Sequence, residues 1–259
     1  MKFPAVQGLI ERRILVNYRV DAHAIRRVVP PPHRPPLVAG NAIAGICLIR
    51  LSGARPRGVP SFLGVRSENA AHRIAVEWDD ASGHHVGVYI PRRDTSSRFN
   101  TLVGGRFFPG EHHPADFHVR ESDGRYEVDM LSRDGGVRVM IRARIADALP
   151  AGSMFTSLAA ASAFFRQGSL GYSATSDRTR FDGLELECRD WAVRPLHVEA
   201  VRSSFFENTE LFRPGDVAFD NALLMTNVRH RWLGRPSLCC DNAGAAQAEP
   251  TIATTFASK

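Results

Sequence analysis

The chain has 259 residues, is 44% hydrophobic and 23% charged, and carries a formal net charge of +6, which excludes a disordered or collagen-like protein and allows one large core. Its four cysteines are scattered without a CxxC spacing, so we expect reduced thiols and no disulfide scaffold. The longest apolar stretch, residues 42–49, is too short to span a bilayer, and residues 1–13 lack the apolar core of a signal peptide. We therefore expect a cytoplasmic protein without a membrane partner.

The basic residues are almost all arginines, since the only two lysines are Lys2 and Lys259. The arginines alternate with acidic residues, as in Arg120-Glu121 and Arg133-Asp134, and form no long basic run. This pattern indicates a solvated surface of mixed charge, so we expect no nucleic-acid partner. The chain also offers no lysine away from its ends for covalent chemistry.

The first elements are a short helix and a buried strand. Residues 21–30 predict a helix capped by Asp21 and stopped by the prolines at 30–32. Residues 41–51 form a nearly continuous apolar run, which is typical of a strand buried on both faces. Alternating residues then predict half-buried strands joined by hairpins, with Arg73 and Glu77 on the polar face of the first. These strands are residues 73–78, 86–90, 125–130 and 137–145.

The last third of the sequence predicts one more helix and further strands. Residues 157–167 form a helix with Thr156 or Ser157 as its cap and Gly168 as its stop. Residues 184–201 and 217–229 again resemble strands, whereas residues 241–259 predict a disordered C-terminal tail. Because strands dominate without a βαβ rhythm, we expect an α+β fold: a single domain over residues 1–240, with an antiparallel, barrel-like sheet that encloses a pocket.

Chemistry-bearing residues are concentrated between Ser67 and His118, whereas the motifs of dinucleotide enzymes, P-loop NTPases, zincins and α/β-hydrolases are absent. This segment holds acidic, basic and hydroxyl side chains among strands, as a small-ligand pocket requires. The candidate acid/base residues are Glu68, His113 and His112, and the candidate substrate-binding residues are Arg98, Arg106 and Asn69. Each also has a structural interpretation, as a surface ion pair or an exposed loop histidine.

A metal site formed by His112 or His113 with Asp116 and His118 is a weaker alternative. Adjacent residues of a strand point to opposite faces, so only one of the two neighbouring histidines would serve. We therefore expect no metal and no organic cofactor.

The same region resembles a known superfamily. The motifs SEN (67–69), HRIAVEW (72–78), GVYIP (87–91) and GGRFFPGEHH (104–113) are similar to the core of the acetoacetate decarboxylase-like proteins. The chain most closely resembles an uncharacterised bacterial family related to that enzyme, through the further motifs SSFF (203–206) and FDNALLM (219–225). This resemblance covers nearly all of residues 10–240 and implies an acetoacetate decarboxylase-like fold.

The resemblance also implies a departure in mechanism. In the decarboxylase a glycine-arginine-glutamate run is followed by a glycine and two lysines, the first of which forms a Schiff base. Gly105, Arg106 and Gly110 fit this pattern, but Phe107 replaces the glutamate and His113 falls at or beside the Schiff-base position. An imidazole cannot form an iminium, so the Schiff-base mechanism is not expected. By the same resemblance, Glu68 corresponds to the family's pocket carboxylate.

Two functions remain open on the sequence. The first is an enzyme that acts on a small carboxylate or carbonyl compound by lyase- or hydrolase-type acid/base chemistry, with Glu68 and His113 or His112 as the pair. The second is a non-catalytic protein that binds a small ligand in the same cavity. Neither the reaction, the ligand nor the oligomeric state can be read from the residues, and a homo-oligomer is compatible with them.

Overall fold

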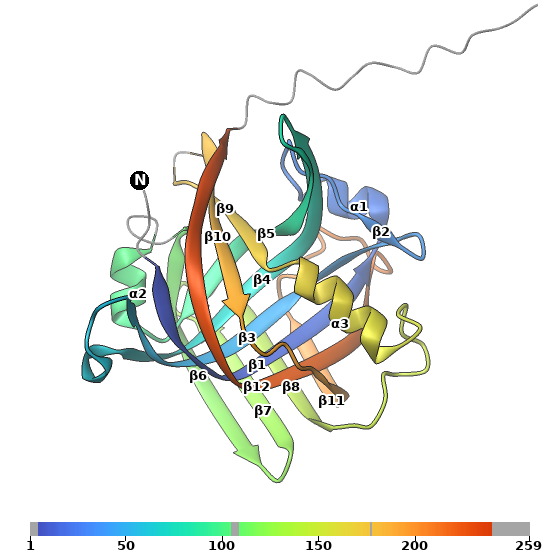
Figure 1. Cartoon of the computed structure of the whole chain (residues 1–259). Coiled ribbons are helices and arrows are strands. Elements are labelled where there is room, and N and C mark those ends of the chain that lie inside the picture. Colours follow the sequence, from blue (N-terminus) through green and yellow to red (C-terminus); the bar gives the residue numbers. More distant parts are fainter. Residues whose placement is uncertain (1–4, 105–108, 177, 240–259) are drawn as a thin grey trace, which may run out of the picture.

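The computed structural model describes residues 5–104, 109–176 and 178–239, and most of them lie in strands (Figure 1). No helix in these ranges is long and apolar enough to cross a membrane. The elements in chain order are β1 (Val6–Val20), α1 (Ala22–Arg26), β2 (Leu37–Val38), β3 (Asn41–Pro56), a 3-10 turn (Ser61–Leu63), β4 (Val65–Asp80), β5 (Gly83–Thr95), α2 (Arg98–Val103), β6 (His112–Ser122), β7 (Arg125–Ser132), β8 (Arg138–Ile145), α3 (Leu158–Gln167), β9 (Leu170–Ala174), β10 (Arg180–Cys188), β11 (Arg194–Ser203) and β12 (Val217–Cys239).

Hydrogen bonding closes the sheet into two rings that share five strands, β12, β1, β3, β4 and β5. The first ring is completed by β6, β7, β8 and β11, and the second by β9 and β10. The rings separate because the long strand β12 pairs with β11 through residues 222–224 and with β10 through residues 230–239. The expected antiparallel sheet is thus confirmed, apart from two short parallel pairings of β5 with β6 and β9.

The shared strands are buried on both faces, because each face looks into a different ring. Ile14, Ile46 and Ile74 belong to the large core that fills the first ring. Their neighbours Leu15 and Cys47 face the second ring, where they pack with residues of α3 such as Phe165. This arrangement explains the unbroken apolar run of residues 42–49, which a sheet with one solvated face would not need.

Helices α1 and α3 begin where the sequence predicts, whereas α2 was not predicted. The Asp21 side chain accepts hydrogen bonds from the backbone N–H groups of His23 and Ala24 at the start of α1. Ser157 accepts from the N–H group of Ala160 at the start of α3, and Gly168 ends that helix. In Figure 1, α3 lies across the strands beside β9, whereas α2 lies at the left of the view.

Three expectations need correction. Strand β1 was not predicted, although it pairs with β3 and β12 along its whole length. Residues 184–201 form parts of two strands, β10 and β11, because residues 189–193 leave the sheet. Arg73 does not point into solvent: it is 6% exposed, because the second ring covers the face of β4 that a single half-buried sheet would expose. The expected tail of residues 241–259 lies outside the described ranges.

Candidate functional site

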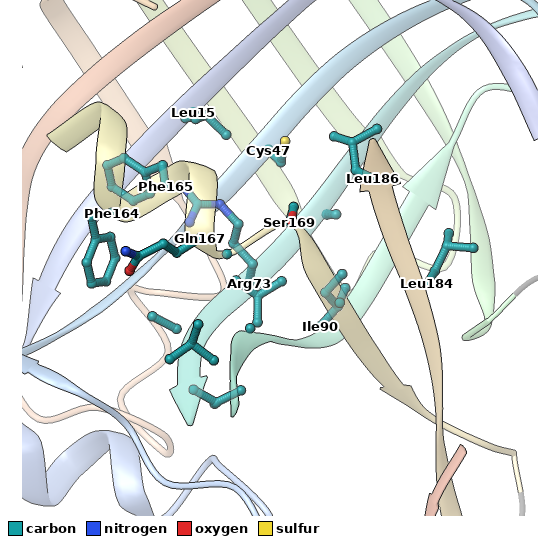
Figure 2. A pocket seen from close by; sticks show the side chains of 18 of the residues that line it. Leu15, Cys47, Arg73, Ile90, Phe164, Phe165, Gln167, Ser169, Leu184 and Leu186 are labelled. Carbon is teal, nitrogen blue, oxygen red and sulfur yellow. The ribbon is translucent and has the colours of Figure 1, made fainter. Parts of the chain in front are cut away.

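The second ring encloses a cavity with two lobes. The α3 lobe has a volume of about 190 Å³ and lies beneath Phe164 and Phe165 of α3, next to Leu15 (Figure 2). The α2 lobe, of about 440 Å³, lies against Phe99 and Asn100 of α2. The two lobes adjoin, since they share a set of wall residues, and together they match the size of known small-molecule pockets. The shared residues are Cys47, Ile49, Ala71, Arg93, Leu184 and Trp232.

Three arginines line the α3 lobe, and we call them the arginine cluster: Arg13 of β1, Arg73 of β4 and Arg93 of β5. Arg13 and Arg73 are buried, with 7% and 6% exposure, and Arg93 is of intermediate exposure. All three point to the same side of the shared strands. Arg13 lies two residues before the inward-facing Leu15, Arg73 lies two residues after Ala71, and Arg93 is paired with Ala71 across the sheet. In Figure 2 the Arg73 side chain reaches toward α3, and its guanidinium carbon lies 4.9 Å from the centre of the Phe165 ring.

The arginine cluster has no carboxylate partner within 4.0 Å among the described residues. Arg13 donates from Nε to the Cys47 sulfur at 3.0 Å, and Arg93 donates from Nε to Ser173 Oγ at 3.2 Å. Arg73 donates to the side-chain oxygen of Asn17, while its buried Nε has no partner in the described part of the chain. The acceptors of these three arginines are therefore all neutral, and the Nε of Arg73 is still able to donate a hydrogen bond.

Burial acts directly on the charge of these groups. It lowers the pKa of Arg73 to about 10, with the neighbouring Arg13 acting in the same direction and Cys47 opposing it. Burial likewise lowers the pKa of Arg93 to about 10, again opposed by Cys47. Both guanidinium groups stay protonated at neutral pH. Since a buried charge without a partner costs several kcal/mol, the cavity is electrostatically suited to an anion.

His112 of β6 lies in the α2 lobe and is a neutral imidazole. Its Nδ1 is 3.1 Å from the carbonyl oxygen of Gly110. Because a carbonyl only accepts, Nδ1 carries the proton and Nε2 is left as an acceptor. Burial first, and then the charge of Arg93, lower the pKa of His112 to about 3. The ring can therefore receive a hydrogen bond or a proton in transit, but it does not rest as a cation.

Asn69 also lies in the α2 lobe, on β4, yet its amide is used within the protein. Its side-chain nitrogen donates to Ser67 Oγ at 2.9 Å, and its oxygen accepts from Thr95 Oγ1 at 2.8 Å. Asn100 of α2 donates to the same oxygen at 3.5 Å. Asn69 therefore ties β4, β5 and α2 together at the wall of the lobe.

Glu68 lies on the opposite face of β4 from Asn69 and lines neither lobe. Its two oxygens accept from Arg12 and Arg50, each at 2.5 Å. The same two arginines also bind Glu121 of β6, so two carboxylates and two guanidinium groups form a closed cluster on the first-ring side of the sheet. This geometry does not bring Glu68 together with His112 or with the arginine cluster.

The remaining candidates lie away from the cavity or outside the described ranges. His113 points to the other side of β6 from His112, with its Nδ1 3.2 Å from an oxygen of Asp134. Arg98 is exposed at the start of α2. Arg106 lies outside the described residues. Among the described residues, no group of three or more His, Cys, Asp or Glu side chains could hold a metal ion.

Sequence reasoning missed the arginine cluster, which is the main polar feature of the cavity. The only available signal was the position of each arginine inside an apolar strand pattern, as in Arg13-Ile-Leu-Val and His-Arg73-Ile-Ala-Val. In a chain so rich in arginine, this signal does not distinguish a cavity residue from a surface residue without knowledge of the second ring.

Comparison with known proteins assigns the chain to a family. The family model DUF2071, described as an uncharacterized conserved protein, matches residues 10–223. No curated protein matches the chain.

Solved structures share the fold at low sequence identity. An acetoacetate decarboxylase-like enzyme from Sphingomonas wittichii RW1 is 10% identical, with a TM-score of 0.58 over 91% of this chain and 92% of the other. Acetoacetate decarboxylase from Legionella pneumophila is also 10% identical, with a TM-score of 0.55 over 90% and 88%. The enduracididine biosynthesis enzyme MppR, in complex with pyruvate, is 12% identical, with a TM-score of 0.53 over 92% and 90%. The chain therefore belongs to the DUF2071 family and has the acetoacetate decarboxylase-like fold.

Proposed function

We propose that the protein binds a small carboxylate, such as a 2-oxo acid, in the cavity of the second ring, with the arginine cluster as its anchor. One observation carries this proposal. Arg13, Arg73 and Arg93 line one cavity, and no carboxylate of the described residues neutralises them. A carboxylate ligand would supply both the missing charge and the acceptor for the free Nε of Arg73.

The cavity wall sets the character of the rest of the ligand. Apart from the arginines, most of the wall is apolar, with Ile49, Leu184 and Trp232 between the two lobes. An anionic head at the arginine cluster would therefore place a compact apolar body against these residues. The structure of MppR with pyruvate gives a precedent for a small 2-oxo acid in this fold.

Chemistry on such a ligand would rely on His112 rather than on a Schiff base. None of the described residues is a lysine, and the two lysines of the sequence are Lys2 and Lys259. The free Nε2 of His112 could accept a proton from a ligand in the α2 lobe. The alternative is a protein that binds the same ligand without converting it to a product. The hydrogen bonds of Asn69 with Ser67 and Thr95 favour this alternative, because they leave one fewer polar group to take part in a reaction.

A thermal-shift titration tests the binding. We expect pyruvate and related oxo acids to raise the melting temperature. At a ligand concentration of a hundred times the dissociation constant, the free energy of unfolding should increase by about 2.7 kcal/mol. The amide of the same acid, which lacks the charge, serves as the matched ligand control. An equal shift with acid and amide, or no shift with any anion, would contradict the proposal.

Turnover is tested separately on the bound ligand. Ligands that stabilise the protein are incubated with it and followed by NMR, with His112→Asn as the comparison. Loss of turnover with retained binding in this variant would assign His112 to the chemistry. Binding without any product in the unmodified protein would favour the non-catalytic alternative.

A further inference from the structure

We propose that Cys47 is a nucleophilic thiol that adds reversibly to the carbonyl carbon of the ligand held by the arginine cluster. This inference rests on the proposed function, because it needs an anionic carbonyl compound in the cavity. It goes further by assigning a covalent site.

Cys47 has the position that such a role requires. It lies in the middle of β3, is 4% exposed, and belongs to the wall shared by the two lobes. Its neighbours in the sheet are Leu15 of β1 and Ala71 of β4. Since Ala71 has a small side chain, it leaves room above the sulfur for a ligand atom. Figure 2 shows Cys47 at the cavity wall, on the strand next to that of Arg73.

All three members of the arginine cluster act on this sulfur. Arg13 donates from Nε to Cys47 Sγ at 3.0 Å. The charges of Arg73 and Arg93 both interact electrostatically with the same thiol. Arg13 thus places a cationic N–H donor directly on the sulfur. Cys239, by contrast, is exposed at the end of β12.

The cavity that Cys47 lines also holds a buried donor without an acceptor in the described part of the chain. The Nε of Arg73 is buried and has no partner among the described residues, although the side chain lines the cavity and is only 6% exposed. A buried donor without an acceptor is uncommon in proteins, and a bound carboxylate oxygen would satisfy it. The ligand's acid group and the Cys47 sulfur would then be held by the same three arginines.

The reaction needs no co-reactant. The sulfur forms a bond to the carbonyl carbon, and the π electron pair of the C=O bond moves to the oxygen. The proton lost from the thiol ends on that oxygen, which gives a hemithioacetal from an aldehyde or a hemithioketal from a ketone. The step reverses by the same path. The α2 lobe provides access, since Phe99 lines it and is 58% exposed.

Alkylation with two reagents of similar size tests the site. Iodoacetate carries a carboxylate and iodoacetamide does not, and peptide mass spectrometry reports each cysteine separately. We expect iodoacetate to modify Cys47 at least about tenfold faster than iodoacetamide does, the factor that one charge-assisted hydrogen bond supplies. Cys239 serves as the internal control and should show no preference for the charged reagent.

Two further measurements make the assignment specific. Arg73→Gln should abolish the preference for iodoacetate at Cys47, and excess pyruvate should slow the reaction in the unmodified protein. With ¹³C-labelled glyoxylate, the unmodified protein should give the NMR signal of a hemithioacetal, and Cys47→Ala should lose that signal. The alkylation result does not depend on the folding of any variant.

The outcomes separate this inference from the proposed function. If pyruvate stabilises the protein but Cys47 shows neither the preference for iodoacetate nor an adduct, the thiol is structural and the inference is wrong, while ligand binding stands. If no anion stabilises the protein or protects Cys47, the proposed function fails, and the inference fails with it. An adduct that persists in Cys47→Ala would assign the chemistry to another residue and also overturn the inference.

Discussion

Arg12 and Arg13 are consecutive residues of β1, yet the sheet gives them opposite electrostatic surroundings. Arg12 faces the first ring and binds Glu68 and Glu121, whereas Arg13 faces the cavity and donates to the sulfur of Cys47. Both guanidinium groups are buried, with overall exposures of 2% and 7%. One charge is neutralised within the protein, and the other is available to a ligand.

This contrast predicts opposite effects of the same substitution. Arg12→Met removes one of the two arginines that bind Glu68 and Glu121, which leaves two buried or half-buried carboxylates with Arg50 alone, and it should lower the free energy of unfolding by about 3 kcal/mol. Arg13→Met removes an uncompensated charge while keeping most of the side-chain volume, so the ligand-free protein should lose little stability or gain some. Urea unfolding of both variants measures the difference, and equal losses would show that Arg13 is also paired in solution.

Glu68→Gln should change stability and leave ligand binding intact. The substitution removes the charge that Arg12 and Arg50 bind at 2.5 Å, but it touches no residue of the two lobes. We expect a loss of about 1 to 3 kcal/mol in unfolding free energy and an unchanged dissociation constant for pyruvate. Calorimetric titration is the measurement. A tenfold loss of affinity would contradict this expectation and show that Glu68 contributes to ligand binding.

Stability should fall as the pH drops from 6.5 towards 4. Burial, the largest cause in each case, lowers the pKa of His33 and His230 to about 4 and that of His72 and His112 to about 3. Between pH 6.5 and 4 the unfolded chain therefore binds more protons than the folded protein, so acid favours unfolding. The stabilisation is complete above the unfolded pKa and is lost as the pH falls toward the folded values.

His33 offers a test of that dependence. Its ring packs edge-on to Trp78 and Phe181, at 5.4 and 5.0 Å between centroids, and both of its nitrogens lack partners among the described residues. His33→Phe keeps this packing and removes the titrating group. At pH 4 the free energy of unfolding of the variant should therefore be higher than that of the unmodified protein, by up to about 3 kcal/mol. Substitution of the exposed His118 by Gln is the matched control. Parallel pH profiles of His33→Phe and the unmodified protein would contradict the assignment.

Gly110→Ala should disturb the α2 lobe. Gly110 has a φ of +77°, and a Cβ atom there would lie 2.7 Å from the Cβ atom of Ser173. The carbonyl of Gly110 orients His112, and Ser173 accepts a hydrogen bond from Arg93. The added methyl group should therefore displace the hydrogen-bond partner of His112 and that of Arg93. We expect a loss of about 1 to 3 kcal/mol in stability and weaker pyruvate binding. Unchanged affinity for pyruvate in a folded variant would show that the ligand does not bind in the α2 lobe.

The local structure and the family resemblance could both be predicted from the sequence. Asp21 and Ser157 mark their helix starts because a side-chain cap depends only on neighbouring backbone groups. The apolar run of residues 42–49 indicates a strand buried on both faces, and the motifs of residues 67–113 indicate the acetoacetate decarboxylase-like fold, in agreement with the family match and the solved structures.

Which polar residues face the cavity depends on the closure of the sheet in three dimensions. Alternation along β4 separates Glu68 from Asn69 and Arg73, but it does not say which side is solvent, which is core and which is cavity. That choice depends on the second closure of the sheet through β9 and β10, which involves residues about one hundred positions further along the chain. Because ring closure is a long-range property, Arg73 resembles a surface residue in the sequence and lies inside the cavity in the structure.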